Sequence, residues 1–208
     1  MSEPAAAPAA QGIPTPDTAI HSKRLVLRLV RDEDLRQLLD MNADDIVTRY
    51  LPYESWRDMA DAQAWMSRAL ARLAAGEAWQ FVIVLRESGR VIGSCLLFHF
   101  DLPNGRAELG YLLGRDHWGA GYMQEAAAAL VGYAFGTAGL RRLEAEIDPR
   151  NEASARLLER VGFVKEGHLR ERWDTKGEVS DSGLYGLLRS DWAAGHVAAA
   201  CNTALPPG

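Results

Sequence analysis

The sequence has few cysteines, no long hydrophobic run and no excess of basic residues. Its 208 residues include two cysteines, Cys95 and Cys201, at positions that predict no disulfide framework. No stretch approaches the roughly 18 uncharged apolar residues that a membrane span needs. The N-terminus also lacks the basic start and leucine-rich centre of a secretory signal. We therefore expect a cytoplasmic protein with no membrane partner.

The charge balance is slightly acidic, with 23 Lys and Arg against 28 Asp and Glu and a formal net charge of −5. A broad nucleic-acid footprint needs clustered basic residues, so no nucleic-acid partner is expected. No metal is implied either, because the five histidines lack the spacing of metal ligands. They are His21, His99, His117, His168 and His196.

The length predicts one domain with two tails. Residues 1–20 contain six Ala and four Pro and almost no large apolar side chains. Such a segment buries too little surface to offset its ordering entropy, so it is predicted to be a flexible tail. Residues 193–208 are similar and end in Pro-Pro-Gly. The domain is therefore expected to span residues 21–192.

Hydrophobic periodicity within residues 21–192 predicts an α/β layer arrangement of the α+β type, with a mixed, mostly antiparallel central sheet flanked by helices. Strands are expected around Leu25–Val30, Trp79–Leu85, Val91–Phe100, Ala107–Leu113, Leu140–Ile147, Phe163–Leu169 and Val179–Leu188. Helices are expected around Leu35–Leu39, Met59–Leu73, Tyr122–Phe135 and Asn151–Val161. Cys95 falls inside a strand and is interpreted as a packing residue.

A glycine-rich turn, Gly119-Ala120-Gly121, connects one of these strands directly to a helix. Glycines let a ligand approach the backbone, and the free N–H groups of a first helical turn favour an anion such as a pyrophosphate. The alternative interpretation is a tight strand-to-helix turn that binds no ligand, because such a turn can have the same sequence. A Walker loop would need Lys-Ser/Thr where Tyr122-Met123 stand, and a Rossmann turn would need a third glycine at Gln124.

Together with its neighbours, this turn resembles the GNAT superfamily of N-acetyltransferases, and specifically the ribosomal-protein (RimJ/RimL-like) branch. The resemblance covers His21 to Trp192 and rests on five blocks in the family's order and spacing. These are Lys23–Arg28 followed by Asp34, Glu108–Tyr111, Trp118–Tyr122 with Glu125-Ala126, Asn151–Ser154, and Gly162–Gly167.

The resemblance implies a GNAT fold in which two strands splay apart and acetyl-CoA lies in the opening. The main chain at Leu112 and Leu113 would pair with the pantetheine arm, and Asn151 would contact the arm as well as cap its helix. The pyrophosphate would be held by the amides of Trp118, Gly119, Ala120, Gly121, Tyr122, Met123 and Gln124.

The same resemblance implies two catalytic residues. Glu108 is the candidate general base, with Glu171 and Asp174 as rivals and Asp181 as a weaker one. Many family members have a tyrosine that protonates the leaving thiolate, but Leu158 stands at that position here. In this branch the hydroxyl that matches Ser154 is the proposed substitute, so Ser154 takes the role of acid.

The acceptor is expected to be a primary amine, and a protein N-terminal α-amine fits best. At pH 7.5 about a third of an α-amine with a pKa of about 7.8 is neutral, against about 0.1% of a lysine. A small amine such as an amino acid, polyamine or antibiotic is the alternative, and a CoA-binding module without catalysis is another. Eight aromatic or histidine residues could line the amine pocket: Tyr50, Tyr53, Trp56, Phe98, His99, Phe100, Trp173 and Tyr185. Many relatives form dimers, so a homodimer is also an expectation.

Overall fold

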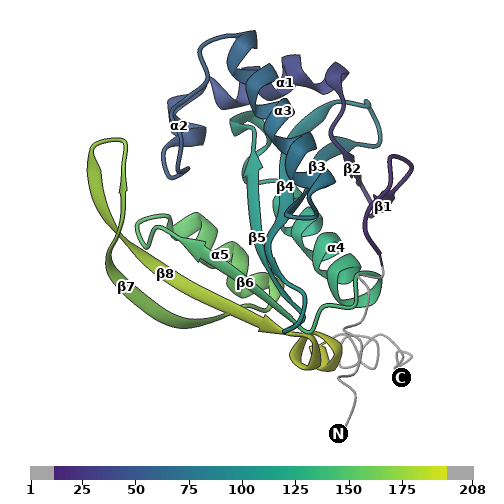
Figure 1. Ribbon diagram of the computed structural model, residues 1–208, viewed down its shortest axis with the longest axis vertical. Coiled ribbons are helices and arrows are strands. Elements are labelled where there is room, and N and C mark those ends of the chain that lie inside the picture. The colour runs from purple at the N-terminus through teal and green to yellow at the C-terminus, as the bar shows by residue number, and fades with distance from the viewer. Residues whose placement is uncertain (1–11, 196–208) are drawn as a thin grey trace, which may run out of the picture.

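One eight-stranded sheet organises the computed structural model, which describes residues 12–195 (Figure 1). The strands are β1 Ala19–His21, β2 Leu25–Leu29, β3 Ala78–Leu85, β4 Val91–Asp101, β5 Arg106–Leu113, β6 Arg142–Ile147, β7 Val164–Thr175 and β8 Glu178–Leu188. Their order across the sheet is β1-β2-β3-β4-β5-β6-β8-β7. Every neighbouring pair is antiparallel except β5–β6. The predicted mixed, mostly antiparallel sheet is confirmed.

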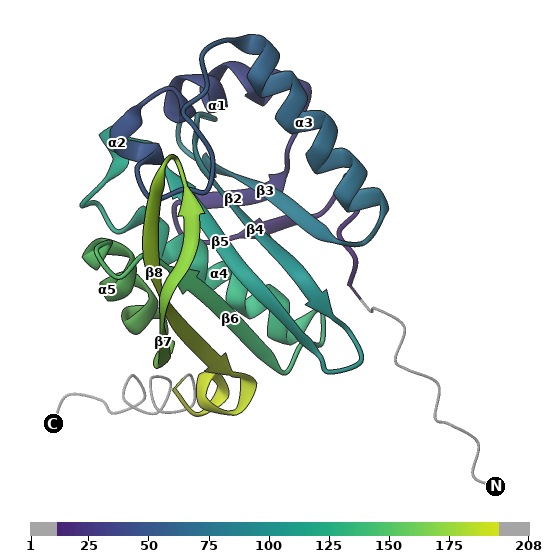
Figure 2. The same cartoon turned by 60° about the vertical axis from the view of Figure 1, so that its left-hand side comes forward.

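Helices cover both faces of the sheet (Figure 2). They are α1 Leu35–Asn42, α2 Asp45–Thr48, α3 Met59–Ala74, α4 Tyr122–Gly136 and α5 Glu152–Val161, with 3-10 turns at Asp32–Asp34 and Arg115–His117. One core lies between the sheet and α4 and α5, and a smaller one lies beneath α1 and α3. The α4 face predicted from helical spacing is buried, because Ala126, Leu130 and Ala134 are all 0% exposed.

Alternation along the strands divides the residues between the two cores. Leu25, Leu27 and Leu29 point into the larger core, as the sequence pattern predicted. Val82 joins the smaller core, whereas its neighbours Phe81 and Ile83 join the larger one. Both faces of the central strands are therefore apolar and buried.

The ends of the ordered domain differ from the prediction. Strand β1 pairs with β2 through Ala19↔Arg28, and the Tyr133 hydroxyl donates to the Gly12 carbonyl at 2.6 Å. Residues 12–20 are thus tied to the sheet and to α4, so the predicted tail is wrong for them. At the other end, residues 189–195 are helical, so the helix includes the first three residues of the predicted C-terminal tail. Residues 1–11 and 196–208 of the two predicted tails lie outside the described residues.

The parallel pair β5–β6 opens into a V. Only three residue pairs join these strands, from Arg106↔Arg142 to Glu108↔Glu144. Beyond Glu108, β5 continues beside β4 as far as Leu113, whereas β6 continues beside β8. The splayed strands implied by the family resemblance are therefore present, and Glu108 lies where they diverge.

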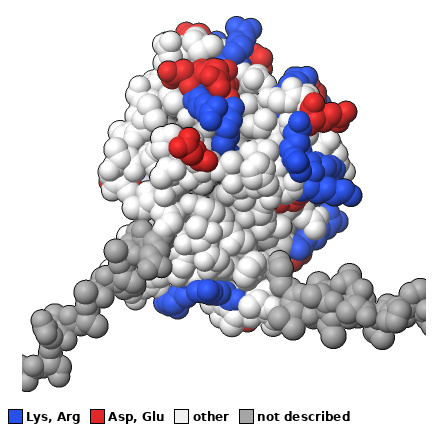
Figure 3. All heavy atoms as spheres, turned by 90° about the vertical axis from the view of Figure 1, so that its right-hand side faces the viewer, with Lys and Arg blue, Asp and Glu red and all other residues white. Residues whose placement is uncertain are grey.

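Charges are mixed over the side of the molecule shown in Figure 3. Basic and acidic side chains lie there in small neighbouring groups, and much of that surface carries neither. Within residues 12–195, no helix combines the length and hydropathy that a membrane span requires.

Candidate active site

A cleft of about 2080 Å³ lies along the V opening. Its lining comes from β4 and β5, the starts of α4 and α5, helices α2 and α3, and the β7–β8 hairpin. The structure brings nearly all of the predicted site residues to this one cleft: Glu108, Leu112, Leu113, Trp118, Gly119, Gly121, Tyr122, Met123, Gln124, Asn151 and Ser154. Ala120 is the exception, and its carbonyl instead accepts a hydrogen bond from Arg24.

The glycine turn has the geometry of an anion site. Gly119 and Gly121 have φ values of +75° and +76°, which side chains other than glycine rarely adopt. The first intrahelical bond of α4 runs from the Glu125 N–H to the Gly121 carbonyl at 3.2 Å. The amides of Tyr122 to Gln124 therefore precede the helical ladder, at the positive end of the helix dipole.

The space in front of this turn is open. A Cβ on Gly119 would meet no atom within 4 Å, and one on Gly121 would meet only Arg24 Nη2, at 3.6 Å. Crowding by other described residues therefore does not explain why these two positions lack a side chain. An open, amide-lined concavity of this kind fits the pyrophosphate of a coenzyme.

Arg24 and Glu125 hold the turn in place, although sequence reasoning gave neither a role. The Arg24 guanidinium donates to the Ala120 carbonyl at 2.9 Å, pairs with Glu125 at 2.6 Å and lies 4.3 Å from the centre of the Tyr122 ring. Glu125 also accepts from the Arg24 backbone N–H and from the Ser22 hydroxyl. Strand β2 and the start of α4 are fixed to each other by this pair.

Trp118 connects the turn to the end of β5. Its indole Nε1 donates to the Leu113 carbonyl at 2.8 Å, while the side chain stays 48% exposed. This carbonyl belongs to a residue whose main chain was expected to pair with the pantetheine arm. A further donor would have to use the second lone pair of the same oxygen.

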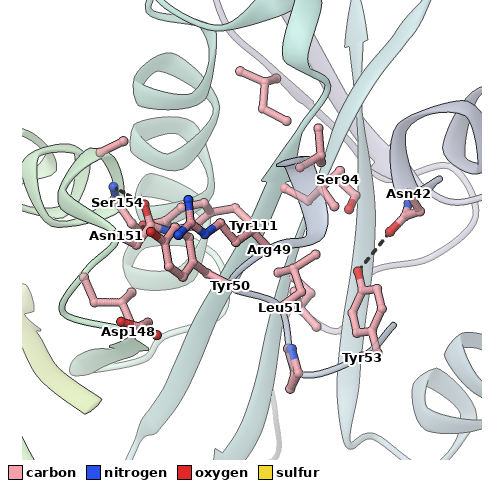
Figure 4. A pocket seen from close by; sticks show the side chains of 18 of the residues that line it. Asn42, Arg49, Tyr50, Leu51, Tyr53, Ser94, Tyr111, Asp148, Asn151 and Ser154 are labelled. Atoms are coloured by element: carbon pink, nitrogen blue, oxygen red, sulfur yellow. Dashed lines mark hydrogen bonds between the residues drawn. The ribbon is translucent and has the colours of Figure 1, made fainter. Parts of the chain in front are cut away.

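Asn151, Ser154 and Tyr111 meet on the other side of the V (Figure 4). The Asn151 side chain accepts from the Ser154 N–H at 3.1 Å, so the predicted N-cap of α5 is present. The Ser154 hydroxyl is 2.5 Å from the Tyr111 hydroxyl, and Ser154 is only 7% exposed. Leu158 is buried in the core and faces no part of the cleft.

Tyr111 is a site residue that sequence reasoning named only as part of a motif. Burial raises the pKa of Tyr111 to about 12, against the opposing effect of its bond to Ser154. The phenol therefore keeps its proton across the physiological range. The signal that could have found it is its place in the splayed strand, but its partner is 43 residues away in sequence.

Glu108 lies at the closed end of the V with a histidine as its partner. His99 Nδ1 is 2.9 Å from a Glu108 carboxylate oxygen, and the Glu108 side chain is 21% exposed. Burial raises the pKa of Glu108 above its ordinary value, although the bond to His99 acts in the opposite direction. His99 reaches this position because the β4–β5 register breaks after Phe98, where His99 has a φ of +49°.

The rival carboxylates lie differently. Neither Glu171 nor Asp174 lines the cleft, and both are exposed on β7. Asp181 does line it, but it is paired with His168 at 2.7 Å and accepts from the Glu171 N–H. Glu146, which was not predicted, also lines the cleft and accepts from the Trp173 indole at 2.8 Å.

The predicted aromatic pocket is partly correct. The lining includes six of its eight members: Tyr50, Tyr53, Trp56, Phe98, His99 and Trp173. Phe100 instead packs against Trp79 at 4.5 Å between ring centres, and Tyr185 is 5% exposed within the core.

Cys95 is fully buried, and burial raises the pKa of its thiol, so it serves packing as predicted. Within the described range no cluster of three His, Cys, Asp or Glu residues is arranged to hold a metal ion.

Comparison with known proteins agrees with this geometry. Residues 24–164 match the family model of the Acetyltransferase (GNAT) domain. The chain belongs to the GNAT acetyltransferase family. It is 36% identical over 174 residues to the uncharacterized N-acetyltransferase p20 of Bacillus licheniformis, covering 84% of this chain and 98% of that protein. It is 31% identical over 189 residues to the [ribosomal protein uS5]-alanine N-acetyltransferase of Escherichia coli, covering 86% of this chain and 95% of the relative.

Solved GNAT structures extend the match to the fold. A putative ribosomal-protein-serine acetyltransferase from Vibrio cholerae superposes with a TM-score of 0.75 at 26% identity, covering 84% of this chain and 99% of that one. The protein is therefore a RimJ/RimL-like GNAT N-acetyltransferase that uses acetyl-CoA as its donor. In this GNAT enzyme, the open glycine turn and the V between β5 and β6 are the features that fit the donor.

Proposed function

We propose that this enzyme transfers the acetyl group of acetyl-CoA to the α-amine at the N-terminus of a protein. The observation that carries the proposal is the V between β5 and β6, which has the open glycine turn before α4 at its open end and Glu108 at its closed end. The ribosomal-protein acetyltransferases among its relatives support the choice of acceptor.

The donor would be bound mainly by backbone groups. The amides from Trp118 to Gln124 would hold the pyrophosphate, while main-chain groups at Leu112 and Leu113 and the Asn151 side chain would contact the pantetheine arm. In this arrangement the thioester would lie between Glu108 and Ser154, and holding it beside the amine would supply much of the acceleration.

Glu108 would take a proton from the ammonium so that nitrogen can attack the thioester carbon. Backbone N–H groups along the open edge of β5 would stabilise the oxyanion that develops. As the C–N bond forms and the C–S bond breaks, Ser154 would give its hydroxyl proton to the leaving sulfur. The second proton that the nitrogen loses would restore the Ser154 hydroxyl, and Glu108 would release the first proton to solvent. The products are an amide, a free thiol and one released proton, and no covalent acyl-enzyme is needed.

A screen of acceptors tests the proposal. Thiol release from acetyl-CoA should be fast with peptides that have a free α-amine, and absent with the same peptides blocked at the N-terminus. Amino acids, spermidine and aminoglycosides form the comparison arm. If these small amines are acetylated and the peptides are not, the acceptor class is wrong; if no amine supports turnover, catalysis itself is refuted.

Glu108→Gln tests the base. A positioned base contributes about 10²–10⁴-fold, so kcat should fall by that order while the KM for acetyl-CoA changes little. The base works deprotonated, so activity should rise with pH through the pKa of Glu108, which burial sets above its ordinary value. The variant should lose this acidic limb of the profile. Glu171→Gln is the matched control, and a larger loss there than in Glu108→Gln would transfer the role to Glu171.

A further inference from the structure

The cleft floor next to Glu108 carries an aromatic ring with a cation above it. Phe98 lies directly across from Glu108 in the β4–β5 register, so the two side chains project from the same face of the sheet. The guanidinium carbon of Arg72, on α3, lies 5.8 Å from the centre of the Phe98 ring. A positive group therefore lies beside the carboxylate that receives the acceptor amine.

Arg68 lies one turn before Arg72 on the same side of α3, and both residues line the cleft. Across residues 12–195, neither arginine has a carboxylate oxygen within 4.0 Å. Arginine presents a planar fork of donors that matches a carboxylate. The guanidinium N–H groups of Arg68 and Arg72 are therefore available to bind a carboxylate of a ligand.

The carboxylates of β6 and β8 nearest to Glu108 are already paired with basic side chains of the protein. Glu146 pairs with Arg172 at 3.3 Å, and Glu144 pairs with Arg106 and Arg142. Asp181 pairs with His168, as described above. Among the described residues Glu108 has the single partner His99, whereas Asp181 also accepts from the Glu171 N–H, so Glu108 keeps acceptor capacity for one ammonium group.

Six other carboxylates line the cleft. Asp148 and Glu178 pair with Arg150, and Glu152 pairs with Arg156. The other three lie on the segment from α2 to the start of α3. Asp45 accepts from the Ser55 hydroxyl, Asp61 lies 3.8 Å from Arg57, and Glu54 is exposed. Arg72 is the charged group that lies over Phe98, directly across from Glu108. A second ammonium group that reached the Phe98 ring would therefore meet Arg72.

From this arrangement we infer that the acceptor is an acidic N-terminus: a chain whose α-amine is followed within two or three residues by Asp or Glu. The inference rests on the proposed function and names the substrate class of the same site. The α-amine binds at Glu108, and the acidic side chain reaches Arg72 and Arg68 across Phe98. An extended chain advances about 3.3–3.6 Å per residue, so the second or third side chain spans the width of the ring. Polyamines, which carry only positive groups, are disfavoured.

The test uses three peptides that differ only at the second and third residues, which are both Glu, both Gln or both Lys. The measured quantity is kcat/KM by thiol release at low salt. We expect the Glu peptide to exceed the Gln peptide by about tenfold, the scale of a charge-assisted hydrogen bond, with the Lys peptide slowest. Because the arginines are partly exposed, added salt should reduce this ratio.

Arg72→Gln should reduce the Glu-to-Gln ratio, and Arg72→Glu should reverse the order in favour of the Lys peptide. Arg36→Gln is the matched control, because Arg36 is an exposed arginine on α1 that does not line the cleft. It should leave the ratio as in the wild type. Thermal unfolding of each variant shows whether the helix still folds.

Equal rates for the Glu and Gln peptides, or a ratio that Arg72→Glu leaves unchanged, would refute the acidic acceptor while leaving peptide acetylation intact. The absence of acetylation on all three peptides would instead refute the proposed function. Faster turnover of spermidine than of the Glu peptide would contradict both.

Discussion

The hydroxyl pair Tyr111–Ser154 shows how single residues can complete a site that family motifs describe only in part. The serine is the proposed acid, but a hydroxyl near the start of a helix can turn back to a carbonyl of the preceding turn. Tyr111, protonated and partly buried, can donate to the Ser154 oxygen at 2.5 Å. The serine proton is then free to point into the V, and its O–H is polarised by the bond it accepts.

Tyr111→Phe should therefore lower kcat by about tenfold, the scale of one lost hydrogen bond, without raising the KM for acetyl-CoA. Ser154→Ala should lower kcat at least as much. Because Tyr111 is a positioning residue that acts through Ser154, adding Tyr111→Phe to Ser154→Ala should cost nothing more. Tyr133→Phe removes another partly buried hydroxyl, bonded to the Gly12 carbonyl away from the cleft, and should leave kcat unchanged. Independent, multiplying effects in the double variant would contradict the coupling.

The limits of sequence reasoning are clearest at this scale. Asn151 and Ser154 were found because they belong to one short block of sequence that resembles the family, at the start of one helix. The pairing of Glu108 with His99 depends on a register break in β4–β5, and Tyr111 meets Ser154 only after β5 and α5 pack together. Such contacts depend on tertiary geometry, which local residue patterns do not contain. Glu171 and Asp174 were rivals for the same reason, since the sequence does not show which side of β7 faces the cleft.

At the scale of elements, the length of each helix or strand decided whether it could be predicted from the sequence. The long strands and the helices α3, α4 and α5 have strong periodic patterns, and all were expected. Strand β1 has three residues and α2 has four, too few to show a period. Strand β1 depends on its register with β2, and α2 depends on the Asp44 side chain, which caps it by accepting from the Ile46 N–H.

The glycine turn before α4 yields a prediction that separates folding from binding. Gly119→Ala places a Cβ at φ +75°, which should lower the free energy of unfolding by about 1–2 kcal/mol. The same Cβ projects into the open space expected for the pyrophosphate, so the KM for acetyl-CoA should rise by about tenfold or more. Gly89→Ala is a matched control in the β3–β4 turn, because Gly89 has φ +70° and equally open surroundings. It should show the loss of stability with an unchanged KM, and an unchanged KM in Gly119→Ala as well would exclude this turn from the donor site.

At the scale of the whole molecule, the Arg24–Glu125 pair couples the N-terminal strands to the helix that begins the donor site. Burial alone would raise the pKa of Glu125, but hydrogen bonds from Arg24 and Ser22 outweigh it and lower that pKa below its ordinary value. A carboxyl whose pKa is lower in the folded state stabilises the fold above its unfolded pKa. That contribution is lost as the pH falls through the folded pKa.

Glu125→Gln should therefore lower the free energy of unfolding by about 1–3 kcal/mol near neutral pH, because the charged bonds to Arg24 and Ser22 weaken together. Urea unfolding at a series of pH values checks the sign: the difference between wild type and variant should shrink as the pH falls below about 4.3, the ordinary value for glutamate. Glu33→Gln removes an exposed carboxylate with a looser partner at 3.5 Å and should change stability by less than about 0.5 kcal/mol. Because Arg24 also contacts the Ala120 carbonyl and the Tyr122 ring, Glu125→Gln should also weaken acetyl-CoA binding. A variant that lost stability but bound the donor normally would show that the glycine turn keeps its shape without this pair.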